Sequence, residues 1–209
     1  MVIYGGTFDP VHNGHIKTAL NVQNHFHFDE FIFLPCKIPV LKKQAFATPA
    51  QRIEMLELAL EPFAKENHFK IDLTEINRET PSYMVDSLHL FRKKFGKKKA
   101  ITLLMGQDSF NQLPSWHKWS ELLSLANILV IQRAGLSNTP ELKNWVQKYQ
   151  TFDSSALKSQ AQGLLYFYDA GTYKVSSSWI RQHHLEVNNL EDYLPASVLN
   201  FVQQNKLYL

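Results

Sequence analysis

Short apolar runs recur along the chain, separated by segments in which apolar residues return every three or four positions. The runs predict buried strands at residues 2–4, 31–34, 69–73, 100–105, 127–131 and 164–167. The intervening periodicity predicts helices at residues 16–22, from 49, from about 79 to 95, at 141–148 and from 176. Strands that alternate with helices predict a Rossmann-like, doubly wound α/β fold, in which helices cover both faces of a parallel sheet.

Length and composition predict one ordinary packed domain. The chain has 209 residues, of which 44% are hydrophobic. No convincing linker divides it, so we expect a single domain over residues 1–209. Its C-terminal part, about 176–209, is predicted to be small and helical.

Charge and hydropathy limit the partners that the chain can have. A formal net charge of +3 suits anionic small molecules but falls short of a nucleic-acid-binding profile. No apolar run approaches the ~18 residues of a membrane span, and no signal peptide opens the chain. The single cysteine, Cys36, excludes an internal disulfide and fits a reducing compartment. We therefore expect a cytoplasmic protein with no membrane or nucleic-acid partner.

The stretch from Gly5 to His15 joins the first predicted strand to the first predicted helix. It reads Gly-Gly-Thr-Phe-Asp-Pro-Val-His-Asn-Gly-His. Ligands of open α/β sheets bind at the carboxyl ends of strands, and unpaired N–H groups at a helix start attract phosphate. Gly5 and Gly6 permit a tight turn and a close ligand approach, and Gly14 leaves room for a flat or bulky ligand group. We expect a phosphate site here.

His12 and His15 are three residues apart and share one face of a helical turn. We expect both imidazoles to donate hydrogen bonds to a ligand, with the Thr7 hydroxyl beside them. Half of a zinc site is the alternative interpretation, but a third ligand at a fixed spacing is missing from the sequence.

A second polar segment, residues 175–181, reads Val-Ser-Ser-Ser-Trp-Ile-Arg at a predicted helix start. Ser177 and Ser178 offer hydroxyls, and Arg181 lies one turn further along on the same side. A serine cap alone would explain the serines. We expect instead that this segment meets residues 5–15 at one edge of the sheet and offers its hydroxyls and free N–H groups to another phosphate.

These two segments carry a family resemblance. His12-Asn13-Gly14-His15 resembles the HxGH signature of the nucleotidyltransferase superfamily, and residues 175–181 resemble its ISSTxIR signature. The longer string from Gly5 to His15 resembles that of bacterial nicotinate-mononucleotide adenylyltransferases. The resemblance implies a single nucleotidyltransferase domain, with His15 and Arg181 on the triphosphate.

The middle of the chain matches the family less closely. Gly106-Gln107-Asp108 matches a GxD element, while Met84 replaces a threonine and Leu41 replaces a histidine. The implied catalytic residues are His15, His12, Arg181 and Lys42. The implied ATP or phosphate contacts are Gly5, Gly6, Thr7, Phe8, Gly14, Gly106, Asp108, Ser177 and Ser178. The implied mononucleotide contacts are Tyr83, Met84 and Trp116. A helix cap is the alternative role for Asp108, and packing is the alternative for Tyr83 and Trp116.

The resemblance implies adenylyl transfer from ATP to nicotinate mononucleotide, giving deamido-NAD and pyrophosphate in NAD biosynthesis. It also implies Mg²⁺ held mainly by the ATP phosphates and water, because Mg²⁺ dehydrates reluctantly. Nicotinamide mononucleotide and pantetheine phosphate stay open as alternative substrates. A nucleotide-binding module without turnover is the alternative from another class, although the second signature argues against it. The sequence does not indicate an oligomeric state.

Overall fold

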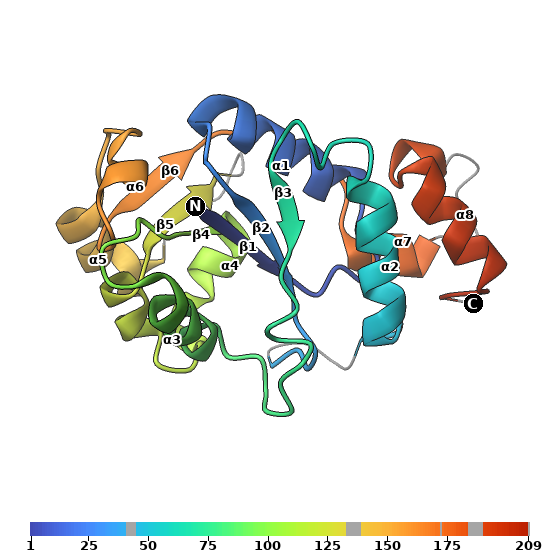
Figure 1. Ribbon diagram of the computed structural model, residues 1–209, viewed down its shortest axis with the longest axis horizontal. Helices are drawn as coiled ribbons and strands as arrows, with labels where there is room; N and C mark the ends of the chain where they lie inside the picture. The colour runs from blue at the N-terminus through green and yellow to red at the C-terminus, as the bar shows by residue number, and fades with distance from the viewer. Residues whose placement is uncertain (41–44, 133–138, 172, 184–189, 209) are drawn as a thin grey trace.

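The computed structural model describes residues 1–40, 45–132, 139–171, 173–183 and 190–208. Its centre is a six-stranded sheet in the order β3-β2-β1-β4-β5-β6, in which every neighbouring pair is parallel (Figure 1). The strands are β1 (Val2–Gly6), β2 (Phe31–Pro35), β3 (Phe69–Ile71), β4 (Thr102–Gly106), β5 (Asn127–Ile131) and β6 (Leu165–Tyr168). This order is that of a doubly wound fold, so the predicted class is confirmed.

Helices cover both faces of the sheet because successive strand residues point to opposite sides. The helices are α1 (Asn13–Phe26), α2 (Pro49–Leu60), α3 (Met84–Phe95), α4 (Gln107–Asn111), α5 (Lys143–Tyr149), α6 (Ala156–Ser159), α7 (Ser177–His183) and α8 (Ala196–Gln204). Short 3₁₀ helices are η1 (Leu113–Ser115), η2 (Trp119–Ser124), η3 (Pro140–Leu142) and η4 (Leu190–Asp192).

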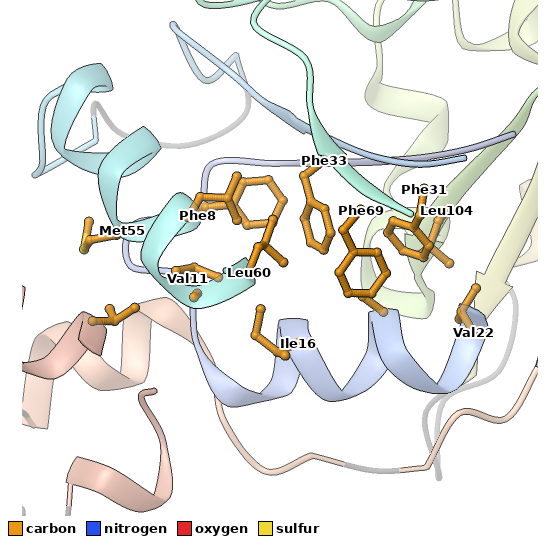
Figure 2. Close-up of a cluster of buried hydrophobic side chains, with 14 of the residues drawn as sticks. Phe8, Val11, Ile16, Val22, Phe31, Phe33, Met55, Leu60, Phe69 and Leu104 are labelled. Carbon is orange, nitrogen blue, oxygen red and sulfur yellow. The ribbon is translucent and has the colours of Figure 1, made fainter. Parts of the chain in front are cut away.

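The two faces bury two separate clusters. Phe31 and Phe33 of β2 pack with side chains of α1, α2 and α8 (Figure 2). Ile32 and Leu34 of the same strand pack with side chains of α3 and η2 on the other face. Both alternating sets are apolar, as a sheet covered on both faces requires.

The start of α2 agrees with the sequence-based prediction, whereas the start of α3 does not. The capping box predicted for α2 is present, because Thr48 and Gln51 bond reciprocally to each other's backbone N–H groups. The predicted helix from residue 79 begins instead at Met84. Pro81 disfavours helical backbone at the residue before it, and the Ser82 Oγ accepts the Lys37 N–H at 3.1 Å, which holds this segment as a loop.

The C-terminal helices pack on the α1 side of the sheet. Val198 and Phe201 of α8 lie in the same buried cluster as the side chains of α1 and α2, and Ser197 donates to the Leu58 carbonyl at 3.1 Å. Within the described ranges, no helix has the length and apolar character needed to cross a membrane.

Candidate active site

The carboxyl end of β1 lies where the winding direction of the sheet changes. The β1–β2 ladder runs as far as the Gly6–Pro35 pair, whereas the β1–β4 ladder runs from Val2–Thr102 to Tyr4–Leu104. The chain winds outward in both directions from these two central strands, which makes their boundary the topological switch point. Ligands of doubly wound sheets bind at this point.

The second residue of the loop after β1, Phe8, is strained but buried. Phe8 has a φ of 50°, a left-handed conformation that costs a non-glycine residue about 1–2 kcal/mol. Phe8 is 2% exposed and lies in the buried cluster shown in Figure 2, and its ring packs edge-on to His15 with ring centroids 5.1 Å apart. Because the ring belongs to the core, any contact of Phe8 with a phosphate has to come from its backbone.

His12 and His15 form a capping box out of two imidazoles. The His12 N–H donates to His15 Nδ1 at 3.2 Å, and the His15 N–H donates to His12 Nδ1 at 3.3 Å. The rings stack with centroids 3.6 Å apart. Since each Nδ1 accepts a hydrogen bond, each neutral ring carries its proton on Nε2, and this assignment rests on the bonding pattern. The reciprocal cap and the stacking together fix the orientation of both rings.

The start of α1 is less open to phosphate than the sequence predicts. The Asn13 N–H donates to the Tyr193 carbonyl at 2.8 Å, and the His15 N–H is used within the capping box. Two first-turn N–H groups therefore already have acceptors, which corrects the expectation that the helix start is open. Imidazole donors and the helix dipole are what this end of α1 offers to an anion.

Gly14 also differs from its predicted role. A Cβ built on Gly14 would lie 2.8 Å from the Val175 side chain and 3.1 Å from the His12 ring. The space above Gly14 is thus occupied by the second signature segment, not left open for a ligand group. Gly14 is needed because residues 12–15 and Val175 pack closely together.

Gly5 packs against Met84, another residue that the sequence linked to the site. A Cβ on Gly5 would lie 2.7 Å from the Met84 methyl group at the start of α3. The side chain of a predicted mononucleotide contact therefore lies directly on the glycine turn. This packing joins the β1 loop to α3.

Asp9 connects the β1 loop to three other segments. Its carboxylate is 4% exposed and accepts the Phe46 N–H at 2.8 Å and the Ala47 N–H at 3.0 Å. Tyr208 donates to the same carboxylate at 3.0 Å, and the Arg181 Nη1 lies 3.8 Å from it. The sequence showed Asp9 only as a letter of the motif and did not indicate this role.

Arg52 of α2 is the second residue that the sequence analysis missed. It is 0% exposed and donates to four backbone carbonyls, those of Thr7, Cys36, Lys37 and Ala47, at 2.7–3.3 Å. The acceptors follow β1, follow β2 and precede α2. Arg52 therefore fixes the β1–α1 loop relative to both ends of the β2–α2 loop.

The second signature segment meets the first one, as predicted. Arg181 Nη1 donates to the Asp9 carbonyl, and the Ser177 hydroxyl donates to the Pro10 carbonyl at 2.9 Å. Arg181 Nη2 donates to the Ser178 Oγ at 3.3 Å, and the guanidinium lies 4.9 Å from the centre of the Phe46 ring. The Ser177 hydroxyl thus joins the two segments, while Ser178 is exposed.

The carboxyl end of β4 is more exposed than that of β1. Gly106 is exposed, and a Cβ built there would have no neighbour within 4 Å among the described residues. Gly106 is itself the N-cap of α4, and Asp108 lies in the first turn of that helix. The alternative that Asp108 is the helix cap is therefore wrong. Asp108 is exposed.

Tyr83 and Trp116 lie next to the same group of loops. Tyr83 is the N-cap of α3, and its ring packs on His117 with centroids 4.4 Å apart. Trp116 is half-buried against the second cluster, and its Nε1 is buried without an acceptor among the described residues. Trp116 is therefore partly a packing residue, as the alternative interpretation proposed.

Beneath Tyr83, a buried carboxyl fixes the loop before α3. Glu75 is 2% exposed and accepts from the Ser87 hydroxyl at 2.6 Å. Burial raises the pKa of Glu75, while the hydrogen bond from Ser87 and the nearby Arg78 charge oppose this effect. Lys42 and Leu41, together with Arg133 beyond β5, lie outside the described residues.

A comparison with protein families follows this geometry. Residues 3–183 match the model of the family described as cytidylyltransferase-like. A protein of Legionella pneumophila (strain Lens) is 41% identical over 100% of this chain and 98% of its own. A protein of Methylococcus capsulatus is 38% identical over 99% of this chain and 98% of its own. Both are named probable nicotinate-nucleotide adenylyltransferase.

The chain belongs to the nicotinate-nucleotide adenylyltransferase family. The prediction of a nucleotidyltransferase of this family is thereby confirmed.

Solved structures of adenylyltransferases have the same fold. The nicotinic acid mononucleotide adenylyltransferase of Plasmodium falciparum, complexed with NaAD, matches with a TM-score of 0.74 and 17% identity. The match covers 99% of this chain and 96% of that one. The same protein complexed with APC gives a TM-score of 0.73 at 17% identity, with the same coverage. At this identity the similarity concerns the fold alone.

Proposed function

We propose that this chain transfers the adenylyl group of ATP to nicotinate mononucleotide, giving deamido-NAD and pyrophosphate. The observation that supports this best is the joining of the two signature segments, in which Arg181 and Ser177 bond to the Asp9 and Pro10 carbonyls. Relatives of 41% and 38% identity over nearly the whole chain carry the corresponding name.

The reaction needs no nucleophile from the protein. A phosphate oxygen of the mononucleotide, already an anion at neutral pH, forms a bond to the α-phosphorus of ATP. The bond from that phosphorus to the bridging oxygen breaks, and pyrophosphate leaves with its electron pair. Catalysis of phosphoryl-type transfer consists mainly of positioning and charge stabilisation.

His12 and His15 supply donors for the charge that develops on the phosphates. Their Nδ1 atoms are engaged with backbone N–H groups, so the Nε2–H groups are the atoms that donate. Donors held rigidly before the reaction begins stabilise the transition state without a reorganisation cost. The stacked rings and the helix cap provide that rigidity.

Arg181 supplies a positive charge from the opposite segment. Its bonds to Asp9 and Ser178 and its stacking on Phe46 fix the plane of the guanidinium. A planar guanidinium suits phosphate recognition because its donors match the spacing of two oxygens. Lys42 of the loop after β2 stays a prediction for the same charge.

Mg²⁺ is the cofactor that this chemistry implies. The described residues contain no group of three or more His, Cys, Asp or Glu side chains arranged to hold a metal. The exposed Asp108 carboxylate fits an ion that is held mainly by phosphate oxygens and water, through one of those waters. The ion would neutralise charge on the triphosphate and on the leaving pyrophosphate.

The mononucleotide would lie on the α3 side of the switch point. Met84 already packs on Gly5, and Tyr83 and Trp116 place aromatic rings beside the loops of this edge. We propose that these three residues contact the pyridine nucleotide, the Tyr83 and Trp116 rings through stacking and Met84 through apolar contact.

A pyrophosphate-release assay tests the proposal directly. Purified protein is incubated with ATP and Mg²⁺ and with nicotinate mononucleotide, nicotinamide mononucleotide or pantetheine phosphate in turn, and the product is identified by mass. We expect the highest kcat/KM with nicotinate mononucleotide and a product with the mass of deamido-NAD. A higher kcat/KM with either other substrate, or no release with any, would contradict it. Excess chelator is expected to abolish release.

A further inference from the structure

The last residues of the chain turn back toward the β1 loop. After α8, the Leu207 N–H donates to the Val202 carbonyl at 3.0 Å and the Lys206 N–H donates to the Gln203 carbonyl at 3.2 Å. Lys206 has a φ of 50°. This is the Schellman pattern of hydrogen bonds, which closes a helix and reverses the chain direction. The position of Tyr208 is therefore specified by the backbone that precedes it.

Tyr208 extends from this turn to Asp9. Its hydroxyl donates to Asp9 Oδ1 at 3.0 Å and lies 3.9 Å from the Met55 Sδ of α2. Its ring packs against the buried cluster of α1, α2 and α8. Burial, with the neighbouring Asp9 carboxylate, raises the pKa of Tyr208 well above its usual value. The phenol therefore stays protonated and acts as a donor.

The Asp9 carboxylate has its donors in a definite arrangement. Oδ2 accepts the Phe46 N–H, while Oδ1 accepts both the Ala47 N–H and the Tyr208 hydroxyl. The Asp9 carbonyl also accepts a hydrogen bond from Arg181 Nη1. The same Nη1 lies 3.8 Å from Asp9 Oδ2. Without the Tyr208 hydroxyl, Oδ1 would keep only the Ala47 N–H, and the carboxylate would be held less firmly and present a different electrostatic field to Arg181.

We propose that Tyr208 is a positioning residue for adenylyl transfer, which holds the Asp9 carboxylate in the orientation that places Arg181. The inference rests on the proposed function, because Arg181 matters here as a triphosphate donor. Tyr208 acts through Asp9 and has no need to contact a substrate. The C-terminal turn after α8 thus belongs to the machinery of the site, although it lies almost the whole length of the chain from the β1 loop.

The test replaces only the hydroxyl. Tyr208→Phe keeps the ring packing and removes the donor. Tyr168→Phe is the matched control, because the Tyr168 hydroxyl donates to Asn21 Oδ1 at 2.6 Å without touching either signature segment. Both variants are assayed for pyrophosphate release at a temperature at which both are folded. We expect about tenfold lower kcat/KM for ATP in Tyr208→Phe, the effect of one hydrogen bond to a charged group.

The pattern of the loss separates positioning from general stability. We expect the KM for the mononucleotide to stay within about twofold in Tyr208→Phe, and Tyr168→Phe to keep both kinetic constants within the same range. In an Arg181→Ala background, the further change Tyr208→Phe should cost less than about twofold, because the group that it positions is gone.

Three results would overturn the inference. They are wild-type kinetics in Tyr208→Phe, an undiminished tenfold effect in the Arg181→Ala background, or a Tyr208→Phe protein that never folds. The last would make Tyr208 a residue of the fold alone. A wild-type protein that releases no pyrophosphate would instead contradict the proposed function, so the two failures are distinguishable.

Discussion

Two arginines each bind several backbone carbonyls, one at the carboxyl ends of the strands (the carboxyl edge) and one at their amino ends (the amino edge). Arg52 donates to four carbonyls in loops that follow β1, follow β2 and precede α2. Arg92 of α3 also donates to four carbonyls, those of Gly96, Lys99, Leu125 and Ala161, which precede β4, β5 and β6. Only the first set includes the loop that carries the signature histidines.

The comparison shows what distinguishes the site from its scaffold. Both edges use a guanidinium to collect backbone carbonyls, so this arrangement by itself indicates stability. At the carboxyl edge it is combined with stacked imidazoles, a buried carboxylate and a second arginine. We infer that rigidity is general to the fold, whereas the described residues bring the stacked imidazoles together with Arg181 at the carboxyl ends of the strands. Each variant at the carboxyl ends of the strands is therefore compared with a variant elsewhere in the molecule.

The largest effect is expected for the two arginines themselves. Arg52→Met should lower the free energy of unfolding by about 3–5 kcal/mol, since it leaves buried carbonyls without donors. Arg92→Met, at a half-buried position, should cost about 1–3 kcal/mol. Denaturant unfolding measures both.

At a temperature where both variants are folded, Arg52→Met should also lose turnover and Arg92→Met should not. Equal turnover in the two variants would remove the distinction between the edges.

The next effect concerns the histidines. His15→Ala should lower kcat by about 10²–10³-fold, the effect of losing one transition-state donor. His15→Asn keeps an acceptor for the His12 N–H and is expected to retain more of the helix cap but little of the turnover. His89→Ala, on the exposed side of α3, is the control and should keep the wild-type kcat. Near-normal kcat in His15→Ala would exclude His15 from the chemistry.

A smaller effect is expected for two exposed acids. Asp108→Asn should lower kcat/KM for ATP about tenfold, with the stability changed by less than about 0.5 kcal/mol. Asp29→Asn removes an exposed carboxylate at the amino edge, near Lys99, and should change neither quantity measurably. Pyrophosphate release as a function of Mg²⁺ concentration checks the role, because Asp108→Asn should need more Mg²⁺. An unchanged Mg²⁺ requirement would count against a part for Asp108 in holding the ion.

The smallest effect is on the pH dependence of stability, which should have opposite signs for two glutamates. Burial raises the pKa of Glu75, so the native state holds its proton more strongly and this residue costs stability as pH rises. Lys70 lowers the pKa of Glu30 at the amino edge, so that residue contributes stability at neutral pH and loses it in acid. Relative to wild type, Glu75→Gln should gain stability between acid and neutral pH, and Glu30→Gln should lose it. Slopes of the same sign in denaturant titrations would contradict this.

The sequence predicted the strands because they depend on local pattern. It predicted the meeting of the two signature segments because both resemble motifs of one family. Apolar runs gave every strand to within two residues. The start of α3 was misplaced because Ser82 bonds to the loop after β2, a partner distant in sequence. Gly14 was interpreted as ligand space because nothing in the motif itself indicates that Val175 packs there.

The residues that organise the site were not predictable in this way. Arg52 has the sequence context of an ordinary helix surface residue, and its burial depends on carbonyls from two loops, one after β1 and one after β2. The contact between Asp9 and Tyr208 spans nearly the whole chain. Single-sequence patterns report neighbours along a helix or strand, so contacts of this kind become visible only in the folded structure.

The most direct test of the account is a crystal structure of this protein with a non-hydrolysable ATP analogue and Mg²⁺. The account predicts one triphosphate at the carboxyl ends of β1 and β4, within about 3.2 Å of both His15 Nε2 and the Arg181 guanidinium. A triphosphate that contacts only one of these two side chains, or that binds at the amino edge of the sheet, would contradict it.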